Sequence, residues 1–103
     1  MTKLKAAFIF IAPDADPKIH RAIVDTPRVM LYVCGVKNYA EAKDVASELV
    51  LKEGVAAVEL CGGFGHEGVA EIAKALKGKA RVGVVRFDIH PGLENRSGDE
   101  IFI

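Results

Sequence analysis

The chain has few side chains that can act as alcohols or amides. Its 103 residues include no Gln and no Trp, and only two Ser, two Thr and two Asn. A hydrolase of the Ser-His-Asp type therefore has almost no serine available as its nucleophile. The two cysteines are too few for a disulfide scaffold and are not spaced as a paired metal-binding motif, so we expect both thiols to be reduced.

Net charge is also missing, because 14 Lys and Arg balance 14 Asp and Glu. No overall field attracts the chain to nucleic acid or to an anionic membrane. The apolar run at 6–12 is followed at once by Pro13 and Asp14, unlike a secretory signal, and no run reaches the roughly 20 apolar residues that cross a bilayer. We therefore expect one cytoplasmic domain spanning residues 1–103.

What the chain has in excess is apolar surface, since 50% of its residues are hydrophobic. Four nearly continuous apolar runs, at 5–12, 29–36, 55–61 and 82–89, predict buried parallel strands. Between them, helices are expected from Asp16, after Asn38 as far as Gly54, and over 66–77, because capping residues precede apolar positions at helical spacing.

This alternation predicts an α/β fold: a three-layer domain with a mainly parallel four-stranded sheet. The preferred strand order is 2-1-3-4, as in flavodoxin-like or Rossmann-like folds, and the alternative is 1-2-3-4. The apolar end at 101–103 predicts a short edge strand or a contact with another subunit. With the apolar excess, it favours a homo-oligomer of two or more copies.

The loop after the third predicted strand has the spacing G-x-G-x-x-G at Gly63, Gly65 and Gly68. Backbone N–H groups before a helix can hold a phosphate or another anion, and Asp88 lies where a dinucleotide site expects an acidic residue. Tight turns into helices need the same glycines, so a plain turn remains open. The candidate ligand-binding residues are Gly62, Gly63, Phe64, Gly65 and His66, with Arg86 supplying charge.

Polar residues also alternate at the end of the fourth predicted strand, where Arg86, Asp88 and His90 share one side. Glu59 on the third strand is expected to pair with Arg86, either to fix strand register or to serve a site. Cys61 precedes a helix, where a thiolate is stabilised, so Cys61, Asp88 and His90 form a candidate catalytic set. His66, Asp88 and His90 form a weaker candidate metal site.

Three stretches, at 7–16, 59–65 and 84–92, resemble those of a family of short bacterial and archaeal proteins known only as a domain of unknown function. The resemblance covers nearly the whole chain. It implies a free-standing small protein and assigns no activity and no catalytic residue.

These patterns predict a protein that binds a small anion, phosphate or carboxylate, at the carboxyl ends of the third and fourth predicted strands. One alternative is a small lyase, isomerase or hydrolase, with or without a metal, that uses Cys61, Asp88 and His90. The other is a structural homo-oligomeric module. The residues do not identify a cofactor, and fold class does not rank the three functions.

Overall fold

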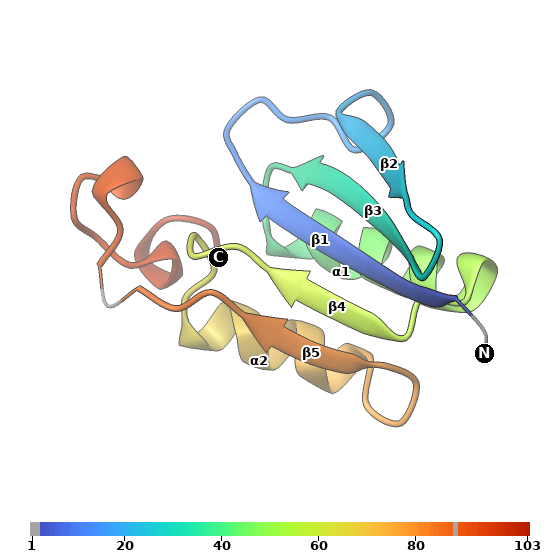
Figure 1. Ribbon diagram of the computed structural model, residues 1–103. Helices are drawn as coiled ribbons and strands as arrows, with labels where there is room; N and C mark the ends of the chain where they lie inside the picture. The colour runs from blue at the N-terminus through green and yellow to red at the C-terminus, as the bar shows by residue number, and fades with distance from the viewer. Residues whose placement is uncertain (1–2, 88) are drawn as a thin grey trace.

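The chain forms a five-stranded sheet and two α-helices (Figure 1). The structure is a computed structural model that describes residues 3–87 and 89–103. Its strands are β1 (Leu4–Ile11), β2 (Arg21–Asp25), β3 (Val29–Val36), β4 (Ala57–Leu60) and β5 (Arg81–Val84). Its helices are α1 (Tyr39–Glu48), extended by the π-helical turn η1 (Leu49–Glu53), and α2 (His66–Ala75). After β5, the chain forms two 3-10 turns, η2 (Pro91–Leu93) and η3 (Gly98–Glu100).

The strand order is β2-β3-β1-β4-β5. Strand β1 lies between β3 and β4, parallel to both, and β4 is parallel to β5. The α/β class is thus confirmed, and the four parallel strands lie in the expected order 2-1-3-4. The fifth strand, β2, was not predicted; it pairs antiparallel with β3 at the edge.

Strand β2 replaces the helix that the capping pattern at Asp16 predicts. Asp16 does cap a turn, since its Oδ1 accepts a hydrogen bond from the N–H of Lys18 at 2.9 Å. The chain then extends and returns at Thr26, whose N–H donates to the Val29 carbonyl at 2.8 Å. The segment 21–25 is too short for its spacing to distinguish helix from strand, and pairing with β3 decides it.

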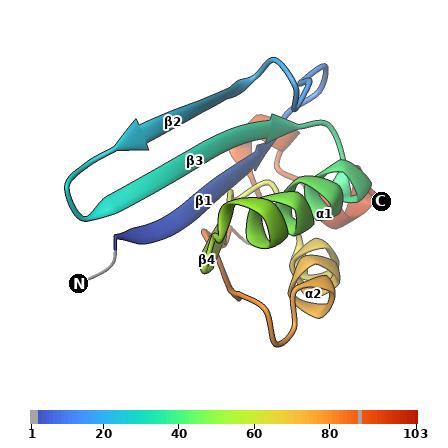
Figure 2. The same ribbon diagram turned by 90° about the vertical axis from the view of Figure 1, so that its right-hand side faces the viewer.

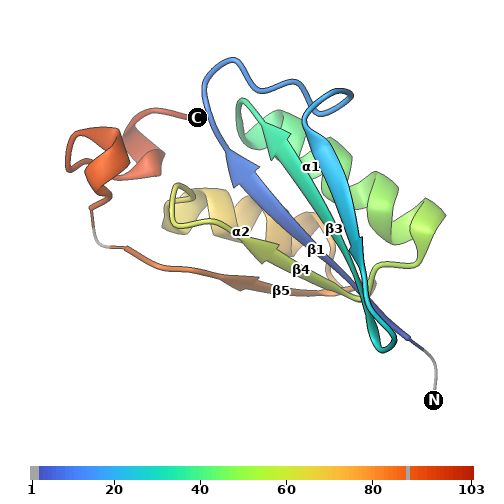
Figure 3. The ribbon, with the colours of Figure 1, turned by 45° about the horizontal axis from the view of Figure 1, so that its top comes forward.

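Both helices pack on the same face of the sheet (Figure 2). In a doubly wound sheet, the first crossover carries a helix on the opposite face, because it runs in the opposite direction from the later ones. Here that crossover contains a loop and β2 instead of a helix. The expected three layers are therefore wrong: over the residues that the structure describes, the domain has two layers, and no helix lies over the other sheet face (Figure 3).

The core lies between the sheet and the two helices. Alternate side chains of the central strands point into it and are almost completely buried, namely Ala7, Ile9, Cys34, Val36, Val58 and Leu60. From the helices, Ala42, Ala46, Leu49 and Ile72 are buried against them. This packing confirms the helical stripes expected after Asn38 and over 66–77.

The predicted start and end of the first long helix are also found. Asn38 Oδ1 accepts a hydrogen bond from the N–H of Glu41 at 2.9 Å, and Gly54 ends the helical region with a φ of 79°. Glu41 reaches back as expected, but its carboxylate accepts from the N–H of Lys37 at 2.9 Å instead of that of Asn38.

Two strand predictions near the C-terminus are wrong. Strand β5 ends at Val84 and not at residue 89, because β4 ends at Leu60 and offers no further backbone to pair with. The edge strand expected at 101–103 is not formed: these residues follow η3, and Phe102 packs into the domain's own core at 7% exposure. In the part of the chain that the structure describes, no helix has the length and apolar character to span a membrane.

Candidate functional site

The loop from β4 to α2 lies at the carboxyl end of the sheet and contains most of the predicted ligand-binding residues. Phe64 is completely buried, and its ring stacks on that of Tyr39 with centroids 5.5 Å apart. Cys61 is half-buried, and its Sγ accepts from the N–H groups of Ile11 at 3.3 Å and Gly63 at 3.4 Å. Phe64 therefore belongs to the core, and the hydrogen bonds to Cys61 Sγ stabilise the turn.

A carboxylate of the chain itself occupies the N-terminus of α2. The N–H of Glu67 donates to both Asp99 oxygens at 3.1 Å, and that of Gly68 donates to Oδ1 at 3.2 Å. The Tyr39 hydroxyl donates to the same Oδ1 at 3.0 Å and accepts from the N–H of Gly65 at 3.1 Å. The donors that the sequence assigns to an external anion are thus used by Asp99, which lies in η3.

The glycine spacing fits this internal contact. A Cβ on Gly65 would overlap the Asp99 carboxylate, and one on Gly68 would overlap the Tyr39 ring. On the other side, a Cβ on Gly98 would overlap the carbonyl of Gly63. The glycines therefore let η3 approach the start of α2 closely.

The electrostatics of this contact favour an ionised Asp99. Partial burial alone would raise the pKa of Asp99, but the N–H groups of Glu67 and Gly68, the Tyr39 hydroxyl and the charge of Arg86 lower it below its usual value. Burial raises the pKa of Tyr39 to about 12, although the N–H of Gly65 opposes the shift. Near neutral pH, a protonated Tyr39 thus donates to a charged Asp99.

Arg86 points toward this cluster and not toward Glu59. Its Nη1 donates to the Phe64 carbonyl at 3.1 Å, while its buried Nε has no hydrogen-bond partner among the described residues. Glu59 is exposed and lies beside Gly83 in the sheet. The expected pair of Glu59 and Arg86 is therefore not formed, because Arg86 follows the end of β5 and turns toward the α2 loop.

Among the described residues, the predicted catalytic and metal-binding side chains form no hydrogen bonds with one another. His66 is exposed at the start of α2, whereas His90 Nδ1 accepts from the N–H of Gly92 at 2.9 Å and the His90 ring packs on Phe87. Asp88 lies outside the described residues. Within residues 3–87 and 89–103, no hydrogen bond joins Cys61 to a histidine, and no three His, Cys, Asp or Glu residues are placed to hold a metal ion.

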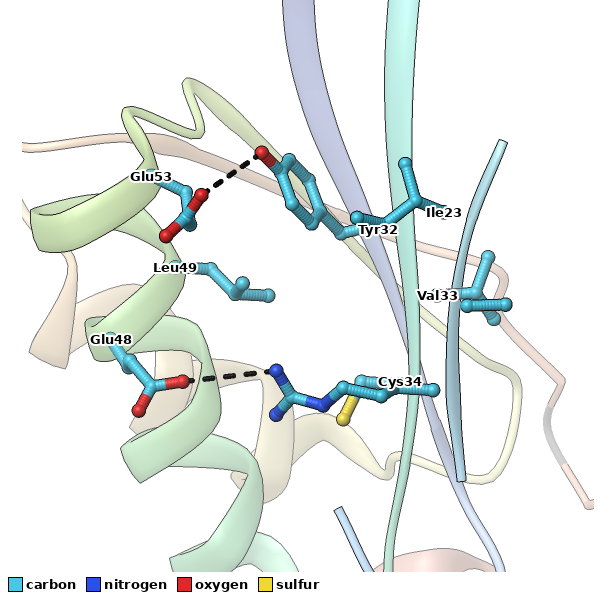
Figure 4. Close-up of a pocket in the computed structure, with 9 residues that line it drawn as sticks. Ile23, Tyr32, Val33, Cys34, Glu48, Leu49 and Glu53 are labelled. Carbon is cyan, nitrogen blue, oxygen red and sulfur yellow. Dashed lines mark hydrogen bonds and ion pairs between the residues drawn. The ribbon is translucent and has the colours of Figure 1, made fainter. Parts of the chain in front are cut away.

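A second site, which the sequence did not indicate, is a pocket of about 480 Å³ between the sheet edge and the end of the first helix (Figure 4). It forms because α1 covers β1 and β3 but not the edge strand β2. Its lining comes from β2, β3, α1 and η1: Arg21, Ala22, Ile23, Tyr32, Val33, Cys34, Glu48, Leu49 and Glu53. Period-two alternation over 21–25 was the signal that could have placed Arg21 and Ile23 on one side of a strand.

Polar groups face each other across this pocket. The Tyr32 hydroxyl donates to Glu53 Oε1 at 3.3 Å, and Arg21 Nη1 lies 3.9 Å from Glu48 Oε1. Burial and then the charge of Glu53 raise the pKa of Tyr32; burial also raises the pKa of Cys34, although Arg21 opposes that shift. Tyr32 and Cys34 are thus neutral near pH 7, and the charges in the lining belong to Arg21, Glu48 and Glu53.

No curated protein and no solved structure matches the chain. The model of one protein family matches residues 4–100, and the function of that family is unknown. This match confirms the resemblance found in the three sequence stretches. The chain therefore belongs to the family of unknown function DUF6506.

Proposed function

We propose that this protein binds a small organic molecule with an apolar body and an amine group in the pocket between β2, β3 and the end of α1. The observation that carries the proposal is a half-open pocket of about 480 Å³ with polar groups on two facing walls. Ligand pockets commonly measure about 300–1,000 Å³ and combine an apolar lining with a few convergent polar groups.

The charge of the lining favours an amine. Two carboxylates, Glu48 and Glu53, face one guanidinium, that of Arg21. The Arg21 Nε already donates to the Pro17 carbonyl at 2.6 Å, and its Nη1 is too far from Glu48 for a strong hydrogen bond. Lys5, which is not part of the lining, donates from its Nζ to the backbone carbonyl of Glu53. The carboxylate of Glu53 does not receive this hydrogen bond. The carboxylates thus keep acceptor positions for an ammonium group.

The apolar part of the ligand has a matching surface. Leu49 points into the pocket between the two carboxylates, and Cys34 lies opposite it (Figure 4). Ile23 is 58% exposed at the rim, so a bound apolar body would remove its side chain from water.

Binding is favoured over catalysis in this pocket. The Cys34 thiol is 2% exposed and its pKa is raised, so little of it is the nucleophilic thiolate at neutral pH. Its Sγ contacts the backbone carbonyls of Pro17 and Gly35 and lies beside the guanidinium of Arg21, which stays protonated and cannot accept the thiol proton. The pocket therefore holds a buried thiol without a base to activate it.

Three probes with one aromatic body test the proposal: 2-phenylethylamine, 2-phenylethanol and 3-phenylpropionate, each titrated in a thermal-shift assay and by calorimetry. The amine is expected to raise Tm most, and the response should fall in Glu48→Gln and Glu53→Gln. Glu71→Gln, which alters an exposed carboxylate of α2 outside the lining, is the matched control. Equal responses to all three probes, a response to the acid alone, or no response refutes the proposal.

A second candidate is the small anion, phosphate or carboxylate, expected at the carboxyl ends of β4 and β5. The observation that favours it is the buried Nε of Arg86 without a partner among the described residues. Because Asp99 holds the N–H donors of α2, the ligand would compete with Asp99. Phosphate should therefore stabilise Asp99→Ala more than the wild type. The candidate fails if phosphate stabilises neither protein, or stabilises Arg86→Gln as much as the wild type.

A further inference from the structure

The sheet face opposite the two helices is almost entirely apolar, although no helix among the described residues covers it (Figures 2 and 3). The strand pairings and the alternation along each strand place these residues on it: Leu4, Ala6, Phe8, Phe10, Ala22, Val24, Val29, Leu31, Val33, Gly35, Ala57, Glu59, Arg81 and Gly83. We name this set the open face. A sheet face that meets water normally carries polar side chains at alternate positions, and here only Glu59 and Arg81 are charged.

The projected area of the open face corresponds to a dimer interface smaller than the standard size. Strands of 8, 5, 8, 4 and 4 residues, with a rise of about 3.3 Å per residue and a spacing of about 4.8 Å, cover about 460 Å² in projection. Side chains add relief to this area, and Leu4 and Val24 within it are exposed. A standard interface buries about 800 Å² per partner, so we expect an interface of modest size.

The open face is also complementary to itself. Consider a second copy related to the first by a two-fold axis. The axis runs parallel to the sheet and perpendicular to its strands, at the level midway between Ala6 and Phe8 of β1. Each strand then lies antiparallel over its own copy, so Phe8 faces Ala6 of the other chain and Phe10 faces Leu4. On β3, Val29 lies opposite the level of Gly35, where the Phe10 ring of the other chain covers the glycine. A large side chain thus meets a small one where Phe8 faces Ala6, and apolar side chains meet one another elsewhere along the two long strands.

The same axis brings the two charges of the open face together. Ala57 pairs in register with Arg81, and Glu59 pairs with Gly83. Reversal about the axis therefore places Glu59 beside Arg81 of the other copy. Because one acid and one base give the face no net charge, two copies do not repel each other.

We propose that the open face is the interface of a homodimer, in which the sheets of two copies pack face to face with their β1 strands antiparallel. Packed sheets lie about 10 Å apart with interdigitating side chains. The inference does not depend on the ligand proposed for the pocket, because that pocket lies on the helix-covered side of the sheet.

Sedimentation velocity over the micromolar range, with the full chain, tests the dimer. The wild type is expected to pass from monomer to dimer as its concentration rises. Glu59→Arg places two arginines together and should raise the dimer dissociation constant about tenfold or more. Adding Arg81→Glu to it restores an opposite pair and should return the constant close to the wild-type value. Asp44→Arg, on the exposed side of α1, is the matched control.

Phe8→Lys gives a second measurement and should abolish the dimer, with circular dichroism showing that the variant folds. A monomer at every wild-type concentration overturns the proposal. So does a dimer that a folded Phe8→Lys leaves intact, or a double charge reversal that restores nothing. Binding of the wild-type monomer to lipid vesicles, without self-association, would assign the open face to a membrane surface and would also overturn the homodimer.

Discussion

Replacing Asp99 with alanine tests whether the C-terminal turn holds the start of α2. The variant loses the carboxylate that accepts from the Tyr39 hydroxyl at 3.0 Å and from the N–H groups of Glu67 at 3.1 Å and Gly68 at 3.2 Å. It leaves the helix N-terminus without its acceptor. We expect a lower free energy of unfolding and no change of fold.

The size of the effect follows from the contacts that are lost. Removing a helix-capping acceptor costs about 1–2 kcal/mol, and a hydrogen bond to a charged group contributes about 1.5–3 kcal/mol when it is protected from water. Asp99 is partly exposed, so water replaces some of these bonds, and we expect a total loss of about 2–3 kcal/mol. In a domain of this size, each kcal/mol lowers Tm by about 4–8 °C, so a decrease of about 8–24 °C is expected.

The pH dependence gives this prediction a sign. Because the folded-state pKa of Asp99 is lowered, its stabilisation is fully present above the unfolded value of about 3.9 and is lost as the pH falls through the folded value. Thermal melts of wild type and Asp99→Ala should therefore differ by a constant amount from pH 7 down to about pH 4 and converge progressively below it. Asp44→Ala is the control. A difference in Tm below about 2 °C at pH 7, or one that persists undiminished at pH 3, would refute the reasoning.

Three further changes probe the same end of the molecule and the first helix. Tyr39→Phe removes the hydroxyl that joins Gly65 to Asp99 and should cost about 1–2 kcal/mol in urea unfolding; an unchanged midpoint would contradict this role. Gly68→Ala would stabilise an ordinary helix by up to about 1 kcal/mol, but here it should destabilise by about 1–3 kcal/mol because its Cβ overlaps the Tyr39 ring, so the sign of the change is the test. Asn38→Ala should cost about 1 kcal/mol in thermal unfolding through loss of the cap on α1, and a neutral result would show that the cap contributes nothing.

The candidate site shows how far sequence reasoning reached. The glycine-rich loop before α2 was located from Gly63, Gly65 and Gly68, because backbone donors before a helix depend on local spacing. The acceptor of these donors, Asp99, was not predicted. It lies more than thirty residues further along the chain, and nothing in its local sequence links it to this loop. Sequence spacing thus predicts which backbone N–H groups can bind an anion, but it does not predict which anion binds them.

The pocket shows the opposite case, in which no local pattern was sufficient. Its walls exist only because β2 pairs with β3 beside the end of α1, and the segment 21–25 is equally compatible with a short helix. A five-residue segment buries too little to select its own structure, so its neighbours select it.

Local pattern was sufficient for the elements that carry long periodic signals: the four parallel strands, the stripe of α1 after Asn38 and the stop at Gly54. It also established that the strands have two apolar faces. Which face is covered by this chain depends on whether the first crossover forms a helix or a strand, and that choice is made by pairing between distant segments. The covered face, the pocket beside β2 and the approach of Asp99 to α2 are therefore tertiary properties, because each joins groups that sequence separation keeps apart and only packing brings into contact.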